Sequence, residues 1–193
     1  MYTRIDFIPS ATDADDGCGG PDASTPGLLG SMRLRQLAGP AGASLTFWDS
    51  QANAASCPEV PGRPATSYDV ADSRAGRAAD ERPSHAALLH FDGPQAPEQV
   101  AAADFGWRER IWPAIADLPG LVGVYALVRH DLGALIIHLS TSMAALETVG
   151  QTVMSTKLLP GEDPALLRGP DRIEFHRVTS YVMPVGAEPP TSR

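Results

Sequence analysis

Pro26-Gly27-Leu28-Leu29-Gly30 occurs a second time in the chain as Pro119-Gly120-Leu121-Val122-Gly123. Each copy leads through an apolar stretch and a glycine-centred turn to a second apolar stretch, Gly42-Ala43-Ser44-Leu45 and then Gly133-Ala134-Leu135-Ile136. The offset between the copies is nearly the same at both landmarks, from residue 26 to 119 and from 42 to 133. A repeat of this period decides the architecture before any single residue is interpreted. We therefore predict a tandem duplication of one structural unit.

Length and composition limit the class of protein. With 193 residues and 43% hydrophobic side chains, the chain can bury a substantial core as one large domain or as two small, closely packed ones. The formal net charge is -8, and no segment concentrates Lys and Arg densely enough to neutralise a run of phosphates. Nucleic acid and anionic membranes are therefore not expected as partners.

Cysteine usage and the N-terminal residues indicate a cytoplasmic protein. Cys18 and Cys57 alone make neither a disulfide framework nor a four-ligand zinc site. Arg4 and Asp6 interrupt the apolar run that a secretory signal would need, and the chain has no window of about 18 apolar residues. We expect no membrane span.

The first half is predicted to contain four strands and one short helix. Asp49 or Ser50 can cap a helix that ends before Pro58. The segment from Pro9 to Pro26 is rich in Asp, Gly and Pro, so no helix comparable to that of the second half is expected there. Residues 72–84 are predicted to form a polar, exposed connector. The predicted strands cover residues 2–8, 29–37, 43–48 and 66–71, with the middle two forming a hairpin.

The second half is predicted to keep the long helix that the first half is expected to lack. Apolar residues at helical spacing predict a helix from Pro97 to Leu118, and Pro113 within it predicts a kink. A second helix is expected from a cap among residues 140–142 towards Lys157. The predicted strands cover residues 86–91, 124–128, 134–139 and 172–183.

The order of elements is the same in both halves: strand, connection, hairpin, helix, strand. This order is typical of a ferredoxin-like split βαβ unit and of the α+β class. We predict a first repeat at residues 1–73, with its first helix reduced to a loop, a linker at 74–84 and a second repeat at 85–193. Leu45, Phe47 and Ile136 suggest that each sheet has a second apolar face, so that two sheets can bury these faces against each other.

Several segments resemble the antibiotic-biosynthesis-monooxygenase-like domains of the dimeric α+β barrel superfamily. Residues 107–123 are similar to that family's helix, which contains a proline like Pro113, and to the Pro-Gly motif with which its next strand begins. Trp48-Asp49-Ser50 resembles its strand-to-helix junction, and residues 68–72 its closing strand. The likeness covers nearly the whole chain in two copies. Since single-repeat members close the barrel as homodimers, the resemblance implies that this chain forms one intramolecular barrel, as a monomer with an internal pseudo-two-fold axis.

The resemblance also implies ligand sites between sheet and helices, lined by aromatic and polar side chains. Trp48 matches the family's junction tryptophan, and Asn53 is the only Asn in the chain. Together with Trp107 and His138 they are predicted to contact a small hydrophobic or aromatic molecule. Each also has a structural interpretation, because large aromatic side chains stabilise a core wherever they are buried.

His90, His138 and His176 lie on three different predicted strands of the second half. Histidine exchanges a proton near neutral pH, so His90 or His176 is predicted to be a catalytic base. Strand parity puts His138 on the face of Ile136, opposite Leu139, and predicts that it points into the core between the sheets and not towards the helices. A buried histidine is more often a hydrogen-bonded structural residue than a functional one.

The family resemblance implies a cofactor-independent monooxygenase acting on a small aromatic, phenolic or quinol substrate. In such chemistry the deprotonated substrate donates an electron to dioxygen, while the protein supplies a base and groups that stabilise the anion. No metal is expected. The competing interpretation is a small-ligand or haem-binding protein of the same fold. Haem degradation is disfavoured because Cys57, and not His, follows Trp48 where the resemblance calls for an iron ligand.

Overall fold

The computed structural model describes residues 1–9, 24–59 and 62–182. Within these ranges the first half contains β1 (Tyr2–Ile8), β2 (Leu28–Gln36), β3 (Gly42–Trp48), α1 (Gln51–Ser56) and β4 (Ala65–Ala75). The second half contains β5 (His85–Phe91), α2 (Pro97–Gly106), the π-helical turn η2 (Trp107–Ile111), α3 (Trp112–Ile115), β6 (Leu121–Val128), β7 (Ala134–Ser140), α4 (Met143–Ser155) and β8 (Arg172–Val182). The predicted strands and hairpins are therefore confirmed to within a few residues. The prediction of no helix before Pro26 falls largely on residues 10–23, which lie outside the described residues.

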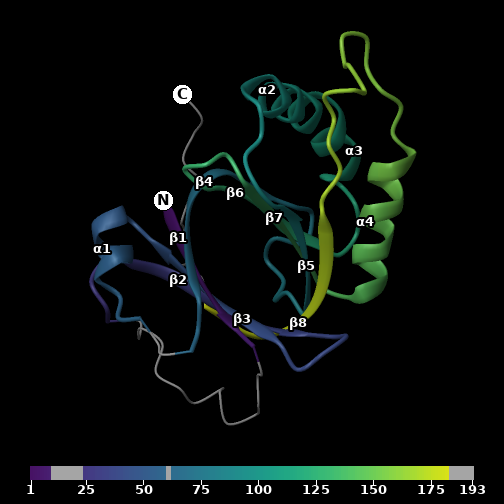
Figure 1. The fold of residues 1–193 in the computed structure, drawn as a ribbon. Helices are drawn as coiled ribbons and strands as arrows, with labels where there is room; N and C mark the ends of the chain where they lie inside the picture. Colours follow the sequence, from purple (N-terminus) through teal and green to yellow (C-terminus); the bar gives the residue numbers. More distant parts are fainter. Residues whose placement is uncertain (10–23, 60–61, 183–193) are drawn as a thin grey trace.

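The strands form one closed antiparallel barrel in the order β1-β3-β2-β8-β5-β7-β6-β4. The first four strands are ordered β4-β1-β3-β2, and the last four have the same order, β8-β5-β7-β6. The pairs β2–β8 and β4–β6 join the two sets. Figure 1 shows α1 on one side of the barrel and α2, α3 and α4 on the other, where α4 contacts β5, β6 and β7.

The barrel interior is a continuous apolar core. Because the side-chain period of a strand is two, Leu45 and Phe47 of β3 point inward together, as do Ile137 and Leu139 of β7. Burying such a side chain contributes about 1.5–3 kcal/mol, so this interior is the main source of stability. Further buried members of this core are Ile5, Met32, Leu34, Ala43, Tyr68, Val70, Ala86, Leu88, Val122, Leu127 and Leu135.

A second, smaller apolar cluster lies outside the barrel, beneath the helices. Its buried residues are Ile115, Leu121, Val124 and Val149, and Ile136 packs against them. Ile136 therefore faces the helices, because it alternates with the inward-facing Leu135 and Ile137 along β7.

Local features correspond between the two halves. Gly27 and Gly120, the glycines of the repeated motif, have φ angles of +76° and +80°, which favour glycine. The carbonyl of Gly27 accepts from Asp49 N at 2.9 Å, and that of Gly120 accepts from Thr141 N at 2.9 Å. One residue further, Ser50 caps α1 by accepting from Asn53 N, just as the Ser142 hydroxyl caps α4.

Strand irregularities also correspond. The β2–β3 register shifts between Leu28 and Gly30, and the β6–β7 register shifts between Leu121 and Gly123, at the same place in the repeated motif. The pairs that join the halves, β2–β8 and β4–β6, each contain one further shift. β-Bulges are specific structural features, so their matched positions extend the correspondence beyond strand order.

The long helix of the second half accommodates Pro113 through a π-helical turn. The amide of Trp112 donates to the carbonyl of Trp107, five residues earlier, and α3 then continues to Ile115. A proline ring clashes with the carbonyl four residues before it, and a π turn is one way to absorb such a conflict. Where a kink was predicted at this proline, the structure has a π turn just before it.

The segment after β4 differs from the exposed connector predicted for residues 72–84. β4 continues to Ala75 because its last residues pair with β6. Beyond it, the amides of Gly76 and Ala78 donate to the carbonyls of Val122 and Leu121, and Ala78 is buried. None of the helices in the described ranges has the length and apolar composition needed to cross a bilayer.

Candidate active site at one mouth of the barrel

Four polar side chains of β5 and β8 point into the barrel at one of its ends. On β8, Arg172, Glu174 and His176 alternate with outward-facing residues, so they share the inner face. On β5, His90 lies opposite Arg172, and Ala86 lies opposite His176. Antiparallel pairing therefore brings His90 and His176 to the same patch of barrel wall, with Glu174 between them. We call these four residues the His–Glu cluster.

Hydrogen bonds connect the cluster. Glu174 Oε2 lies 3.2 Å from His176 Nε2 and 3.6 Å from His90 Nε2. The Arg172 guanidinium lies 2.8 Å from His90 Nδ1, 3.1 Å from Glu174 Oε1 and 2.5 Å from Asp92 Oδ2. His90 Nε2 and His176 Nδ1 are buried and have no hydrogen-bond partner among the described residues. A buried polar atom without a partner costs about 1–3 kcal/mol, so both atoms mark a place where a ligand or water can bind.

Burial determines the charge state of the cluster. Both histidine side chains are only 3% exposed, and desolvation lowers the pKa of His90 and of His176. Glu174 raises both values and Arg172 lowers that of His90, but desolvation is the largest influence on each. Desolvation also acts to raise the pKa of Glu174, yet its histidine and arginine neighbours outweigh it and the pKa is lowered. At neutral pH the cluster therefore holds two neutral imidazoles beside a carboxylate.

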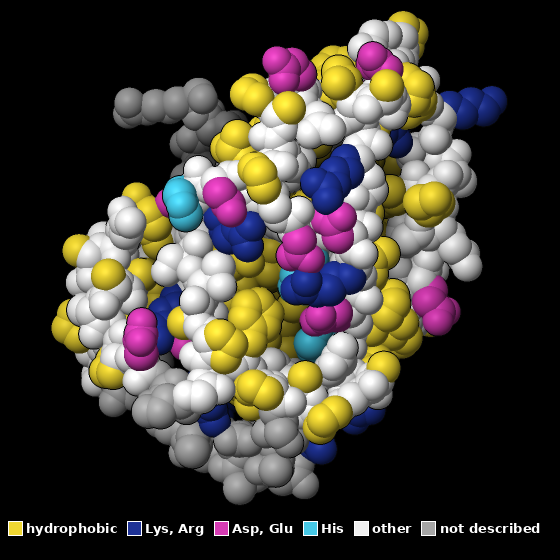
Figure 2. Space-filling model, in the orientation of Figure 1, with side chains coloured by type: hydrophobic (Ala, Val, Ile, Leu, Met, Phe, Trp, Pro, Cys, Tyr) yellow, Lys and Arg dark blue, Asp and Glu magenta, His cyan; other side chains and the backbone are white. Residues whose placement is uncertain are grey.

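The cluster opens to solvent at the mouth formed by the end of β5 and the start of β8. Arg172 and Asp92 have side chains 47% and 48% exposed, whereas the histidines lie deeper. Phe7 of β1 faces His90 with ring centroids 6.5 Å apart. Figure 2 looks onto this face: hydrophobic side chains occupy its centre, and His, basic and acidic side chains line the wall beside them. The mouth thus combines an apolar floor with one polar wall.

Two tyrosines add hydroxyl groups to the interior. Tyr125 of β6 and Tyr181 of β8 share a side-chain hydrogen bond, and Tyr125 packs on Phe47 with ring centroids 5.0 Å apart. Burial raises the pKa of both phenols. Both tyrosines are therefore neutral at physiological pH and act as hydrogen-bonding groups.

Among residues 1–9, 24–59 and 62–75, the first half has no equivalent polar cluster inside the barrel. Phe7 is the sixth residue of β1, as His90 is of β5. Thr3 and Ala86 are the second residues of β1 and β5. Thr3 pairs with Tyr68 of β4, whereas Ala86 pairs with His176 of β8, so Tyr68 takes the place of His176 in the first half. Acid–base chemistry in the barrel interior is therefore concentrated in the second half.

The structure brings together His90 and His176, each predicted as a candidate base, but not the other predicted residues. Trp48 is buried on the outer face of the barrel beside α1, and its indole Nε1 donates to Thr46 Oγ1 at 2.9 Å. Asn53 lies in α1, where its side chain donates to Asp49 Oδ1 at 2.7 Å. Trp107 packs on Trp112 beneath the helices and donates to Asp72 Oδ2 at 2.8 Å. The ligand-contact role predicted for these residues stays a prediction.

The predicted orientation of His138 is wrong. Its neighbour on the same face, Ile136, packs in the cluster beneath the helices, so His138 points outward under the helices and not into the barrel. Strand parity does place His138 with Ile136, but their face of β7 lies beneath the helices and not inside the barrel. Desolvation lowers the pKa of His138 to about 4, so this histidine is neutral at physiological pH.

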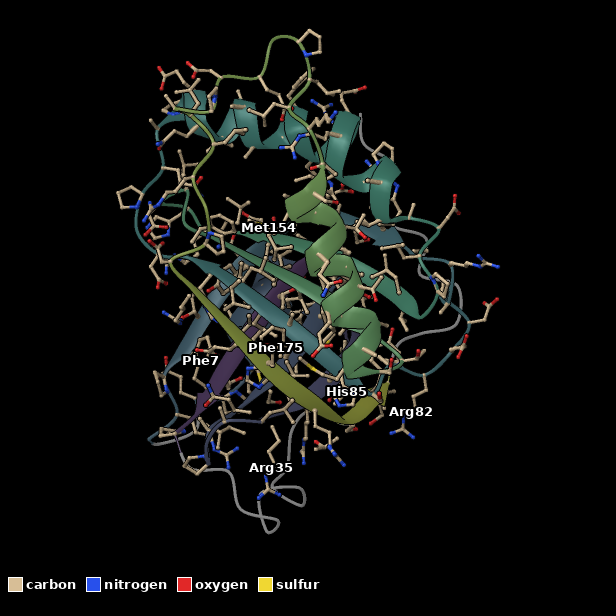
Figure 3. The ribbon with its side chains drawn as sticks, turned by 90° about the vertical axis from the view of Figure 1, so that its right-hand side faces the viewer. Phe7, Arg35, Arg82, His85, Met154 and Phe175 are labelled. Atoms are coloured by element: carbon tan, nitrogen blue, oxygen red, sulfur yellow. The ribbon has the colours of Figure 1, made fainter. Side chains whose placement is uncertain are left out.

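Sequence reasoning missed Glu174 and Arg172, which complete the cluster. The alternation of Arg172, Glu174 and His176 with Ile173 and Phe175 was the available signal. In Figure 3, Phe175 and His85 lie on the outer side of the barrel wall, and Phe7 lies towards the left of the view.

Comparison with known proteins identifies the fold. No protein-family model matches the chain, and no curated protein matches its sequence. The chain is similar to a solved anthrone oxidase-like protein, with 14% identity, a TM-score of 0.59 and coverage of 93% of this chain and 92% of that one. It is similar to a ferredoxin-fold protein from Listeria monocytogenes related to antibiotic biosynthesis monooxygenases, with 9% identity, a TM-score of 0.55 and coverage of 93% and 95%.

A haem-degrading enzyme of Listeria monocytogenes is also similar, with 8% identity, a TM-score of 0.55 and coverage of 92% and 99%. At these identities the similarity concerns the fold alone, because one fold supports many activities. The chain thus adopts the ferredoxin-type barrel fold of monooxygenase-related proteins.

Proposed function

We propose that the chain is a cofactor-independent monooxygenase that binds a small phenolic or quinol substrate at the barrel mouth. The observation that carries the proposal is the His176–Glu174 pair, in which the carboxylate occupies Nε2 and leaves the buried Nδ1 without a partner in the described part of the chain. Such a nitrogen accepts a hydroxyl proton, and the adjacent carboxylate stabilises the imidazolium that forms.

The reaction balances with dioxygen as the only co-reactant. His176 Nδ1 takes the substrate hydroxyl proton, and the phenolate transfers one electron to dioxygen. The resulting phenoxyl radical and superoxide combine at a ring carbon that carries hydrogen, and the imidazolium returns its proton to the peroxide. Loss of water then breaks the O–O bond and leaves a carbonyl at that carbon. One oxygen atom enters the product, the other leaves as water, and the substrate supplies all the electrons.

Charged groups at the mouth favour the anionic intermediate. The Arg172 guanidinium lies against His90, and the Arg129 guanidinium hydrogen-bonds the Tyr68 hydroxyl. Cationic groups in a partly desolvated site stabilise developing negative charge more strongly than in water. The apolar floor that includes Phe7 is suited to the ring of an aromatic substrate.

The similar structures support the reaction class. Their names include anthrone oxidase-like and monooxygenase-related proteins, and the fold is the same. No step of the proposal uses haem.

We also propose that the barrel is an internal pseudo-dimer that arose by tandem duplication. Identical strand order, corresponding bulges, left-handed Gly27 and Gly120, and the Ser50 and Ser142 caps support this origin. After duplication, the histidines of the second half provide a site with no counterpart among the described residues of the first half.

Oxygen uptake tests the function. Wild type and His176→Ala are incubated with a panel of quinols and anthrone-like phenols, and dioxygen consumption is followed with an electrode. We expect uptake by wild type and a decrease of about 10²–10⁴-fold in the variant, the usual effect of losing a general base. His85→Ala is the matched control, because His85 lies on β5 but bonds Ser84. No uptake by wild type, or unchanged uptake by His176→Ala, would favour the ligand-binding alternative.

A further inference from the structure

We propose that the two buried histidines have fixed and opposite hydrogen-bonding roles, so that the site selects a ligand that bears both a hydroxyl group and a second oxygen. In this arrangement His176 offers an acceptor and His90 offers a donor. Arg172 is the positioning residue that holds His90 in its role. The inference rests on the proposed function only for the choice of site, because it concerns binding and not turnover.

The role of His90 follows from its contact with Arg172. A guanidinium carries donors and no acceptor, so Arg172 Nη2, 2.8 Å from His90 Nδ1, must donate to that nitrogen. In the neutral ring the proton is then on Nε2. This Nε2–H is buried and makes no hydrogen bond within the described residues, and its nearest charged neighbour, Glu174 Oε2, is 3.6 Å away. His90 is therefore a donor that awaits an acceptor, and its lone pair is not available as a base.

The role of His176 is set by Glu174. A carboxylate only accepts, so the contact of 3.2 Å between Glu174 Oε2 and His176 Nε2 requires a proton on Nε2. The neutral ring then presents an unprotonated Nδ1, which is buried and lacks a partner among the residues that the structure describes. His176 is the acceptor of the pair and the one histidine of this cluster that can take a proton from a ligand.

Arg172 is held in place from two further sides. Its guanidinium bonds Asp92 Oδ2 at 2.5 Å and Glu174 Oε1 at 3.1 Å, in addition to His90. Three partners fix the planar guanidinium and therefore the tautomer of His90. Glu174 connects both histidines to this network, since one oxygen atom, Oε2, is near both rings.

These roles define the ligand. It must donate a proton to His176 Nδ1 and accept one from His90 Nε2, so it carries a hydroxyl group and a second oxygen. Phe7 beside His90 favours an aromatic ring in the ligand. Aromatic compounds that carry a hydroxyl and a second oxygen, such as a second hydroxyl, an ether or a carbonyl, meet these requirements, whereas a ring without a hydroxyl leaves His176 unpaired.

Binding and NMR experiments test the inference without turnover. Catechol, guaiacol, phenol and veratrole share one ring and differ only in their donors and acceptors. Under anaerobic conditions, catechol and guaiacol should bind at least about tenfold more tightly than veratrole, which lacks the donor, and more tightly than phenol, which lacks the second oxygen. Long-range ¹H–¹⁵N spectra of labelled protein should show His90 and His176 both protonated at Nε2.

Variants separate positioning from simple folding. Arg172→Leu should allow His90 to exchange tautomers and should remove the preference for guaiacol over phenol, while the His176 tautomer stays unchanged. Arg172→Lys, which retains a donor, should restore part of the preference. Arg177→Leu is the matched control on the same strand, because Arg177 is exposed on the outer face.

A proton on His90 Nδ1 in wild type, or veratrole binding as tightly as guaiacol, would overturn the inference even if oxygen uptake is observed. Selective binding of guaiacol without any oxygen uptake would instead refute the proposed function and leave this inference standing.

Discussion

Replacing Glu174 with Gln tests the histidine–carboxylate pair most directly. Glu174 Oε2 lies 3.2 Å from His176 Nε2. At that separation two unit charges attract by about 5 kcal/mol for an effective dielectric constant of about 20. The Glu174 side chain is 24% exposed, and solvent screening reduces the net effect to about 1.5–3 kcal/mol. The pKa of His176, already lowered by burial, should therefore fall further when the carboxylate is removed.

The same loss should appear in the rate. Proton transfer makes an imidazolium at His176, and a transition state that resembles it loses about 1.5–3 kcal/mol of stabilisation, or about 10- to 100-fold in rate. Because the substrate hydroxyl still reaches Nδ1, binding should change much less than turnover.

Two measurements check this prediction. The pKa of His176 is read from NMR titration of its ring protons, and oxygen uptake is followed with a saturating quinol. Glu147→Gln is the matched control, because Glu147 is an exposed carboxylate on α4 and its replacement changes the net charge equally. A pKa of His176 that stays within about 0.3 of the wild-type value in Glu174→Gln would refute the reasoning, since it would mean that the carboxylate does not stabilise the imidazolium.

Three further predictions concern stability. His138 has a folded-state pKa of about 4, below the ordinary value of 6.5, so the unfolded chain binds a proton at this residue first as pH falls. The free energy of unfolding should therefore drop by about 3 kcal/mol between pH 6.5 and 4. Chemical denaturation of His138→Leu should show a smaller drop over the same pH range. Trp48→Ala should lower the unfolding free energy by about 3–5 kcal/mol, because Trp48 is 1% exposed; a loss under about 1 kcal/mol in urea titrations would contradict its core role. Since β2–β8 and β4–β6 join the halves, calorimetry should record one unfolding transition, and two resolved transitions would show independent halves.

Much of the local structure was predictable because its causes are local. Gly27 and Gly120 stand where the backbone has positive φ, and Ser50 and Ser142 cap the helices that follow. Period-two alternation located the hairpins, and the repeated motif indicated that both halves form the same unit. These features depend on residues that are neighbours in the chain, so the sequence alone determined them.

The candidate site required the tertiary structure. His90 and His176 are distant in sequence, and only the β5–β8 register places Glu174 between them and Arg172 against His90. The side of the sheet that His138 faces was decided by which apolar face the helices cover, and alternation along a strand cannot distinguish the two faces. Strand pairing between distant segments and the burial that sets the histidine protonation states arise when the barrel closes, so both belong to the fold as a whole.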